Sequence, residues 1–329
     1  MEDLINQLEH KCKIEDFREI NAKNTIWNFW KITKENIIFT SNNKEYNIKY
    51  KDIYKFYIIE NKSKNDCNNK IREKVIISIA LYKIPVKWLC YSWWYNIYQE
   101  LHKTIKLICK NFNKLVVEYK GGRNNNFDFL FEFYLDDKKI QTKIEFKYNV
   151  NKIEKCPQFL SISCNYFTKI SYAEYFFDEY IHKICKIYNI DIPDKNQYLK
   201  HIYSSNYKSL PFFDFLYNNE KTDINKFNEK NRLVKLSIKN YLEKDIINIE
   251  ELNKKLITSQ ENKIYLLFHN NHFYIETITE DELTCHNVKH IKNNNTIIIT
   301  TRKTEIHMLL RWKNHIGVLY PAWQISLKR

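Results

Sequence analysis

The sequence predicts a mixed α/β protein, and three observations lead to that prediction. Short runs rich in Val, Ile, Phe and Tyr, bounded by polar Asn and Lys turns, recur near both ends of the chain and indicate strands. Apolar residues at helical spacing follow residue 93. Between these regions, two strand-like segments flank a polar turn at residues 135–139 and indicate a β-hairpin.

The N-terminal region, residues 1–92, is expected to be rich in strands with some helix. Strands are predicted at residues 24–32, 36–41 and 45–59. The charged segment at residues 61–74 is typical of a loop. Helical spacing begins near residue 75 and is interrupted at Pro85.

A long helix is predicted from residue 93 because its apolar residues form one continuous stripe. The stripe consists of Trp93, Tyr95, Tyr98, Leu101, Ile105 and Ile108. Hairpin strands follow at residues 127–134 and 140–150, and an amphipathic helix follows at residues 171–188. Residues 93–190 are therefore expected to form a central domain.

The last region, residues 191–329, is expected to contain helices and then antiparallel strands. Helices are predicted near residues 195–206 and 226–243. Strands are predicted at residues 263–268, 272–278, 296–301, 305–313 and 317–327. These strands form a possible DNA-recognition region, for the reasons given below.

The charge of the chain favours a polyanionic partner. Lys and Arg number 53 against 39 Asp and Glu, a net charge of +14. No segment has the length and apolar character of a membrane span, and the N-terminus carries charges where a secretion signal would be apolar. We expect a soluble intracellular protein that binds nucleic acid. An AT-rich genome would also favour Lys, Asn and Ile codons, so codon bias explains part of the lysine excess.

The 8 cysteines show no CxxC pair, which indicates reduced thiols and not a disulfide framework. Cys285, His286 and His290 imitate a zinc site. They lack a second pair of ligands at zinc spacing, so we interpret this segment as an ordinary polar turn.

Charged side chains of the predicted hairpin converge on one face. Because side chains alternate along a strand, Glu145 and Lys147 project to one side and Phe146 to the other. On the preceding strand, Asp128 lies opposite a wall of phenylalanines at positions 127, 129, 131 and 133. We expect the turn to place Asp128 near Lys147, so that two carboxylates and an ammonium meet away from the core.

Such a cluster favours a divalent cation, because two carboxylates at close range repel and raise each other's pKa. Mg²⁺ commonly takes two carboxylates with water and phosphate oxygens, and Asp128 and Glu145 would be its ligands. Mn²⁺ is expected to substitute. Lys147 would lie beside a scissile phosphate, where it stabilises negative charge and holds the attacking water.

Asp128, sixteen intervening residues and then Glu145-Phe146-Lys147 resemble the motif of the PD-(D/E)xK nucleases, which include most restriction endonucleases. Phe127 stands where the family motif has proline. The resemblance implies an αβββα core with a mixed sheet, metal held by Asp128 and Glu145, and a lysine, Lys147, that assists the nucleophile. It also implies Mg²⁺-dependent hydrolysis of double-stranded DNA to 5′-phosphate and 3′-hydroxyl ends, in many members by a homodimer.

The resemblance points to two further site residues. Gln158 lies where the family often has a glutamine that orients the water or contacts DNA. An acid from the long helix often completes the metal site, and both Glu100 and Glu118 are candidates.

Several residues outside the acids are candidate DNA contacts. Gly121 and Gly122 are two of the 3 glycines, and they permit a positive φ or a close approach of phosphate beside Arg123. Arg311 and Lys313 lie among aromatic and base-capable residues near the C-terminus. An ordinary turn and an ordinary sheet edge are the alternatives for these two regions.

Two other functions stay open. A catalytically inactive DNA-binding protein of the same fold would bind without cleaving, although three costly charges kept together argue against it. A structural or interaction protein of an AT-rich virus or parasite would show no metal-dependent cleavage and only weak, salt-sensitive DNA binding.

Overall fold

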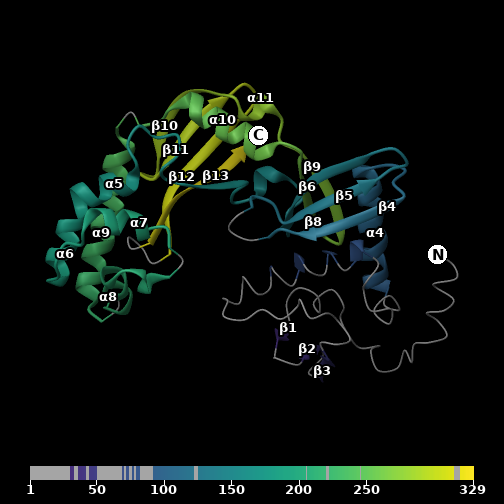
Figure 1. The fold of residues 1–329 in the computed structure, drawn as a ribbon, viewed down its shortest axis with the longest axis horizontal. Coiled ribbons are helices and arrows are strands. Elements are labelled where there is room, and N and C mark those ends of the chain that lie inside the picture. Colours follow the sequence, from purple (N-terminus) through teal and green to yellow (C-terminus); the bar gives the residue numbers. More distant parts are fainter. Residues whose placement is uncertain are drawn as a thin grey trace. The chain divides into compact units, whose positions relative to one another are not determined.

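The computed structural model describes residues 30–32, 36–41, 44–49, 69, 72–73, 76–77, 79–81, 92–121, 125–204, 206–219, 222–244, 246–314 and 319–329. These residues form a mixed α/β structure, as predicted. The chain divides into two compact units (Figure 1). Unit 1 comprises residues 1–152 and 262–277, and unit 2 comprises residues 153–261 and 278–329. This division differs from the three consecutive segments expected, with boundaries after residues 92 and 190, because residues 262–277 return to the sheet of unit 1.

Unit 1 contains a mixed sheet in the order β4–β5–β6–β8–β9. Its strands are β4 (Lys114–Tyr119), β5 (Phe129–Tyr134), β6 (Lys139–Tyr148), β8 (Lys263–His269) and β9 (His272–Glu276). Neighbours are antiparallel except β6 and β8, which run parallel. The predicted hairpin is confirmed as β5 and β6. The parallel neighbour comes from far along the chain, as parallel pairing requires a long crossover.

Helix α4 (Ser92–Ile108) packs against one face of this sheet (Figure 1). Phe129, Phe131 and Phe133 alternate along β5 and are fully buried in the same core. The helix contributes Ile97, Tyr98, Leu101 and Ile105. Because burial of one such phenylalanine stabilises a fold by about 2 kcal/mol, this face fixes the register and leaves the alternate positions for other side chains.

The N-terminal region contains the antiparallel sheet β1–β2–β3. Its strands are β1 (Trp30–Ile32), β2 (Asn36–Ser41) and β3 (Lys44–Lys49), in agreement with the predicted strands. Residues 72–73, 76–77 and 79–80 are helical. Helical structure therefore includes part of the segment that was expected to be a loop up to residue 74.

Unit 2 contains an antiparallel sheet in the order β10–β11–β12–β13–β7. Its strands are β7 (Leu160–Ser163), β10 (Cys285–Lys292), β11 (Thr296–Thr301), β12 (Glu305–Asn314) and β13 (Leu319–Lys328). The last three were predicted, but β7 and β10 were not. The segment with Cys285, His286 and His290 is thus an edge strand and not a polar turn, since it pairs with β11 along its length.

Helices α5 to α9 gather at one end of this sheet, away from α10 and α11 (Figure 1). Unit 2 contains α5 (Tyr172–Phe176), the π-helical η6 (Phe177–Ile181), α6 (His182–Tyr188), α7 (Lys195–His201), α8 (Pro211–Asn219), α9 (Ile224–Leu242), α10 (Ile249–Gln260) and α11 (Glu280–Leu283), with short 3₁₀ turns η5 (Ile153–Lys155) and η7 (Tyr207–Ser209). The helix predicted at 171–188 is confirmed but belongs to unit 2, where Phe176 packs on Trp312 of β12. None of the described helices is both long enough and apolar enough to cross a membrane.

Candidate active site

Asp128 lies just before β5, where the regular pairing between β5 and β6 stops. Its side chain accepts a hydrogen bond from β6 that the backbone of a paired strand would otherwise accept. Regular pairing ends at Phe129 opposite Ile144, and the Asp128 amide donates to the Ile144 carbonyl at 2.9 Å. The Phe146 amide then donates to Asp128 Oδ2 at 2.9 Å. Asp128 is therefore level with Glu145. The expected pairing of Asp128 with Lys147 was wrong by two residues, because the buried phenylalanines of β5 fix the register.

The backbone of Asp128 is held firmly on the other side as well. Its carbonyl accepts hydrogen bonds from the amides of Lys120 at 2.8 Å and Gly121 at 3.0 Å. Asn125 Nδ2 donates to the Lys120 carbonyl at 3.0 Å. A carboxylate on so constrained a backbone is preorganised, which is what a ligand or catalytic group requires.

Glu145 lies between two lysines. Lys147 Nζ is 2.5 Å from Glu145 Oε1, and Lys263 Nζ is 3.0 Å from Glu145 Oε2. The side chains of Glu145, Lys147 and Lys263 are 14%, 22% and 0% exposed. Burial raises the pKa of Glu145, but the charges of Lys147 and Lys263 outweigh burial and hold that pKa below its usual value.

Asp128 has the opposite electrostatic environment. Burial, followed by the negative charges of Glu145 and Glu73, raises the pKa of Asp128 to about 7. The Lys147 ammonium and the Phe146 amide offset only part of this effect. The structure thus brings Asp128, Glu145 and Lys147 into one charged cluster on a partly buried part of the sheet.

Glu73 is the acid that the sequence analysis missed. It is 7% exposed, and the Tyr119 hydroxyl donates to its Oε2 at 2.7 Å. Its charge acts on the Asp128 carboxyl. A sequence signal was present, because Glu73, Ile76, Ile77 and Ala80 follow the i, i+3, i+4, i+7 spacing of one buried helix face.

The two acids proposed to complete the metal site have other partners. Glu100 Oε2 is 3.2 Å from His272 Nδ1, and Glu118 pairs with Lys120. Neither is among the charges that chiefly determine the pKa of Asp128. The electrostatics of the cluster therefore favour Glu73 over Glu100 and Glu118 as its third acid.

Gly121 is explained by packing within the protein. A Cβ atom at this position would lie 2.6 Å from the hydroxyl oxygen and 2.7 Å from Cζ of Tyr119. Its φ is outside the left-handed region, so the positive φ considered above is not the reason for glycine. The close approach comes from the Tyr119 ring, which Glu73 holds by its hydroxyl. Gly122 and Arg123 lie outside the described residues.

The remaining predicted contacts, Gln158, Arg311 and Lys313, belong to unit 2. Gln158 is half-buried between η5 and β7. Arg311 is exposed on β12, and its Nη1 donates to Gln324 Oε1 at 3.2 Å. Lys313 Nζ lies 5.2 Å from the centre of the Tyr320 ring. Their roles toward DNA stay predictions.

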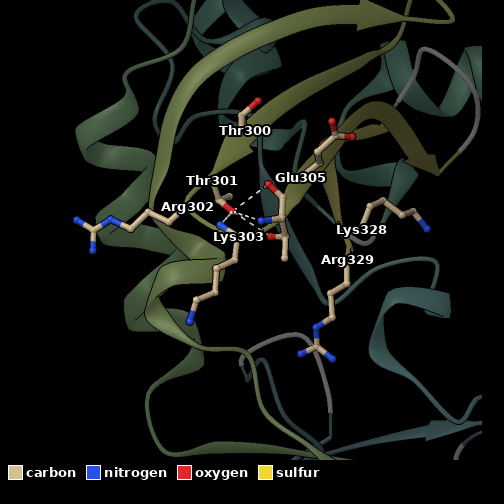
Figure 2. A pocket seen from close by; sticks show the side chains of 8 residues that line it. Thr300, Thr301, Arg302, Lys303, Glu305, Lys328 and Arg329 are labelled. Atoms are coloured by element: carbon tan, nitrogen blue, oxygen red, sulfur yellow. Dashed lines mark hydrogen bonds between the residues drawn. The ribbon is translucent and has the colours of Figure 1, made fainter.

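Unit 2 also has a hollow of about 450 Å³ beside the β11–β12 turn (Figure 2). The lining residues are Thr300, Thr301, Arg302, Lys303, Thr304, Glu305, Lys328 and Arg329. Figure 2 shows Arg302 extending away from the other side chains. Asp281 pairs with Arg302 at 3.2 Å and with Lys303 at 3.0 Å, and Glu282 pairs with Arg329 at 2.7 Å. Neighbouring acids thus offset much of the positive charge.

The donor set of the cluster suits a hard divalent cation. Among the described residues, no three or more His, Cys, Asp or Glu side chains are grouped as a metal site. Mg²⁺ needs fewer protein ligands, because one or two carboxylates usually suffice beside water and phosphate oxygens. Burial and then the charges of Glu145 and Glu73 raise the pKa of Asp128, and a cation beside these carboxylates would offset both effects.

Comparisons with known proteins do not assign this chain to a family. A scan against protein-family models found no match for this chain, and a search of curated proteins found none either. What the protein does has to be inferred from the residues and geometry described above.

Proposed function

We propose that the protein is a Mg²⁺-dependent endonuclease that hydrolyses the phosphodiester bonds of double-stranded DNA. The observation that carries this proposal is the cluster of Asp128, Glu145 and Lys147 at the start of β5 and beside it on β6. Buried carboxylates that repel each other destabilise a fold unless a bound cation offsets the repulsion. Burial, followed by the charges of Glu145 and Glu73, raises the pKa of Asp128 to about 7.

The strand arrangement of unit 1 supports the resemblance to the PD-(D/E)xK nucleases. After α4 come three antiparallel strands, β4, β5 and β6, and β8 adds a parallel neighbour to β6. A mixed sheet with a helix on its apolar face agrees with part of the αβββα core that the resemblance implied, whereas the second helix of that core, predicted at residues 171–188, belongs to unit 2. Asp128 lies just before β5, and Glu145 and Lys147 lie on β6.

Each residue of the cluster has a role in the proposed reaction. Asp128 and Glu145 would hold Mg²⁺, which when bound activates water and neutralises phosphate charge. Lys147 is the more exposed of the two lysines beside Glu145, so it would contact the scissile phosphate and stabilise the charge that develops there. Mn²⁺ would substitute for Mg²⁺, and the products would carry 5′-phosphate and 3′-hydroxyl ends.

The charge of unit 1 supports DNA as the substrate. Residues 1–152 and 262–277, which make up unit 1, contain 29 Lys and Arg against 20 Asp and Glu. An excess of this kind attracts a polyanion and favours release of its counterions. One cluster per chain acts on one strand at a time, so double-strand cleavage would use a homodimer.

The test is incubation of the purified protein with supercoiled plasmid in Mg²⁺, in Mn²⁺ and in EDTA. We expect metal-dependent nicking or linearisation, and ligation of the products would confirm the expected ends. Glu145→Gln should lower the rate of cleavage by about 10³-fold. Glu132→Gln is the matched control, because Glu132 is on the same hairpin but pairs with Lys139 at its far end. Cleavage in EDTA, or full activity of Glu145→Gln, would contradict the proposal.

A DNA-binding protein without catalysis is the second candidate. The observation that favours it is the pairing of Glu145 with both Lys147 and Lys263, which satisfies this carboxylate without a metal. Such a protein would retard DNA in a gel-shift titration and leave the plasmid intact in Mg²⁺ and Mn²⁺.

A further inference from the structure

We propose that Lys263 is a positioning residue that ties Glu145 to the loop carrying Asp128 and so holds the two carboxylates in one geometry. The inference rests on the proposed function for its catalytic consequence. The geometric part concerns Lys263 itself and can be tested without any cleavage.

Two contacts define this position. Lys263 Nζ is 3.0 Å from Glu145 Oε2, and it donates a hydrogen bond to the Asn126 carbonyl. Asn126 lies two residues before Asp128, in the loop that enters β5. A single ammonium therefore connects the second acid of the cluster with the segment that supports the first.

The burial of Lys263 indicates a fixed geometry. Its side chain is 0% exposed, whereas lysine is almost never fully buried unless it is paired. A buried ammonium is tolerated only where hydrogen bonds and opposite charge replace its hydration. Lys263 Nζ also lies 5.1 Å from the centre of the Tyr265 ring. Because its ion pair and its hydrogen bond both point to the acidic cluster, the position of the ammonium and that of the cluster depend on each other.

The two lysines beside Glu145 consequently have different roles. Lys147 is partly exposed and can move toward a substrate, while Lys263 stays in the interior. With Lys263 holding Oε2, the Glu145 side chain keeps its direction when Lys147 leaves Oε1. Lys263 would thus support the reaction without touching the reacting atoms.

Strand pairing explains how this lysine reaches the site. In the parallel ladder, Lys263 is paired with Lys143 and Tyr265 with Glu145. Strand β8 returns to the sheet only after residues 153–261 of unit 2. The site is assembled from residues near 126–128, 145–147 and 263, and the last of these was not among the predicted site residues.

The first measurement is amide hydrogen exchange of the metal-free protein. The Phe146 amide donates to Asp128 Oδ2, so its exchange reports directly on the position of that carboxylate. In Lys263→Met we expect exchange at Phe146 and Asp128 to accelerate by about fivefold, since one net hydrogen bond is worth about 1 kcal/mol. Exchange at Phe131, in the middle of β5, should not change. Uniform acceleration through the sheet, or none at Phe146, would overturn the positioning role.

The second measurement separates turnover from binding in the cleavage assay. A misplaced carboxylate should lower kcat of Lys263→Met by about 100-fold, with KM for DNA within about threefold of wild type. Lys143→Met is the matched control, because Lys143 is paired in register with Lys263 but forms no ion pair with Glu145 among the described contacts. An unchanged kcat, or a loss confined to KM, would exclude a contribution of Lys263 to turnover.

A second variant covers the case in which Lys263→Met does not fold. Lys263→Gln keeps a donor for the Asn126 carbonyl but loses the charge at Glu145, so its Phe146 exchange should still rise. If the wild-type protein cuts no DNA, the proposed function fails while the exchange experiment still decides the role of Lys263. If wild type cuts and Lys263→Gln matches it in both measurements, the positioning role is wrong.

Discussion

The two units both bury acidic side chains, yet the acids are compensated differently. Glu282 in unit 2 is 7% exposed, pairs with Arg329 at 2.7 Å and accepts the Thr279 amide at 2.9 Å at the start of α11. Burial raises its pKa, but Arg329 and Thr279 more than offset burial, so the pKa is lowered. The fold alone satisfies this carboxylate.

Asp128 in unit 1 is not satisfied in this way. Its pKa is raised to about 7 because burial and the nearby Glu145 and Glu73 outweigh the Lys147 ammonium. If the fold needed only a polar side chain at position 128, asparagine would make the protein more stable, because it carries no charge to be buried beside Glu145 and Glu73. The difference between the units teaches that a buried acid whose neighbours leave its charge uncompensated, as at Asp128, indicates a candidate functional cluster.

The largest expected effect separates Glu145 from Glu282. Glu145→Gln should lower kcat by about 10³-fold, since a metal ligand supplies several kcal/mol of transition-state stabilisation. Glu282→Gln should lower stability and leave kcat unchanged, because its charge only balances Arg329. Plasmid cleavage and urea unfolding of both variants test this contrast. A loss of kcat in Glu282→Gln comparable to that in Glu145→Gln would remove the distinction between the units.

The second prediction is a pH dependence of opposite sign in the two units. The folded pKa of Asp128 is about 7, above its ordinary value of 3.8, so the folded protein holds this proton more tightly than the unfolded chain. Ionisation of Asp128 therefore lowers stability as pH rises from about 4 to about 7. Asp128→Asn should stabilise the metal-free protein at pH 8, by on the order of 4 kcal/mol, and have little effect at pH 4.

Asp281 in unit 2 provides the control of opposite sign. Hydrogen bonds from Lys303 and Arg302 lower its pKa, so its contribution is present above its unfolded pKa near 4 and is lost as pH falls. Asp281→Asn should slightly destabilise the protein at neutral pH. Urea unfolding with EDTA at pH 4, 6 and 8 measures both variants. Equal shifts of Asp128→Asn at pH 4 and pH 8 would mean that its carboxylate is not under repulsion.

Local patterns were enough to predict the parts of the site on the hairpin. The alternation around Phe129 and Phe131 identified the apolar face, and the same alternation placed Glu145 and Lys147 on the other face. The predicted pairing of Asp128 was wrong by two residues, because the buried phenylalanines of β5 fix the register and the charged residues do not. Asp128 lies just before the first residue of β5, where its side chain accepts the hydrogen bond from the Phe146 amide.

Residues that reach the site from distant segments could not be placed from the sequence. Lys263 begins a strand that was predicted, but nothing in the sequence shows that this strand runs parallel to β6. Glu73 lies in a charged segment whose polarity outweighed the helical spacing of the isoleucines after it. Strand β10 was missed because its histidines and lysines resemble a turn, and only its pairing with β11 makes it a strand.

The third prediction concerns Gly121, where close packing against Tyr119 within unit 1 accounts for the glycine. Gly121→Ala places a Cβ about 2.6 Å from the Tyr119 hydroxyl, which Glu73 holds in place. We expect a loss of about 1–2 kcal/mol in stability from this overpacking. Tyr119→Leu in the same chain should recover part of the loss. Weaker DNA binding by Gly121→Ala at unchanged stability would instead favour a phosphate contact at this glycine.

The smallest expected effect tests whether unit 2 contributes binding while unit 1 contributes chemistry. Arg311 is exposed on β12 and is oriented by Gln324. Lys303, in the hollow beside the β11–β12 turn, is paired with Asp281. Loss of one phosphate contact lowers the slope of log Kd against log salt by about 1, and we expect this change in Arg311→Ala. Lys303→Ala should leave the slope near that of wild type, because the Asp281 carboxylate already offsets its charge. Both variants should keep the wild-type kcat at saturating DNA.

The measurement is a gel-shift titration in EDTA at several salt concentrations, beside single-turnover cleavage in Mg²⁺. A lower kcat in Arg311→Ala at saturating DNA would assign chemistry to unit 2, and equal slopes for Arg311→Ala and wild type would remove Arg311 from the phosphate contacts.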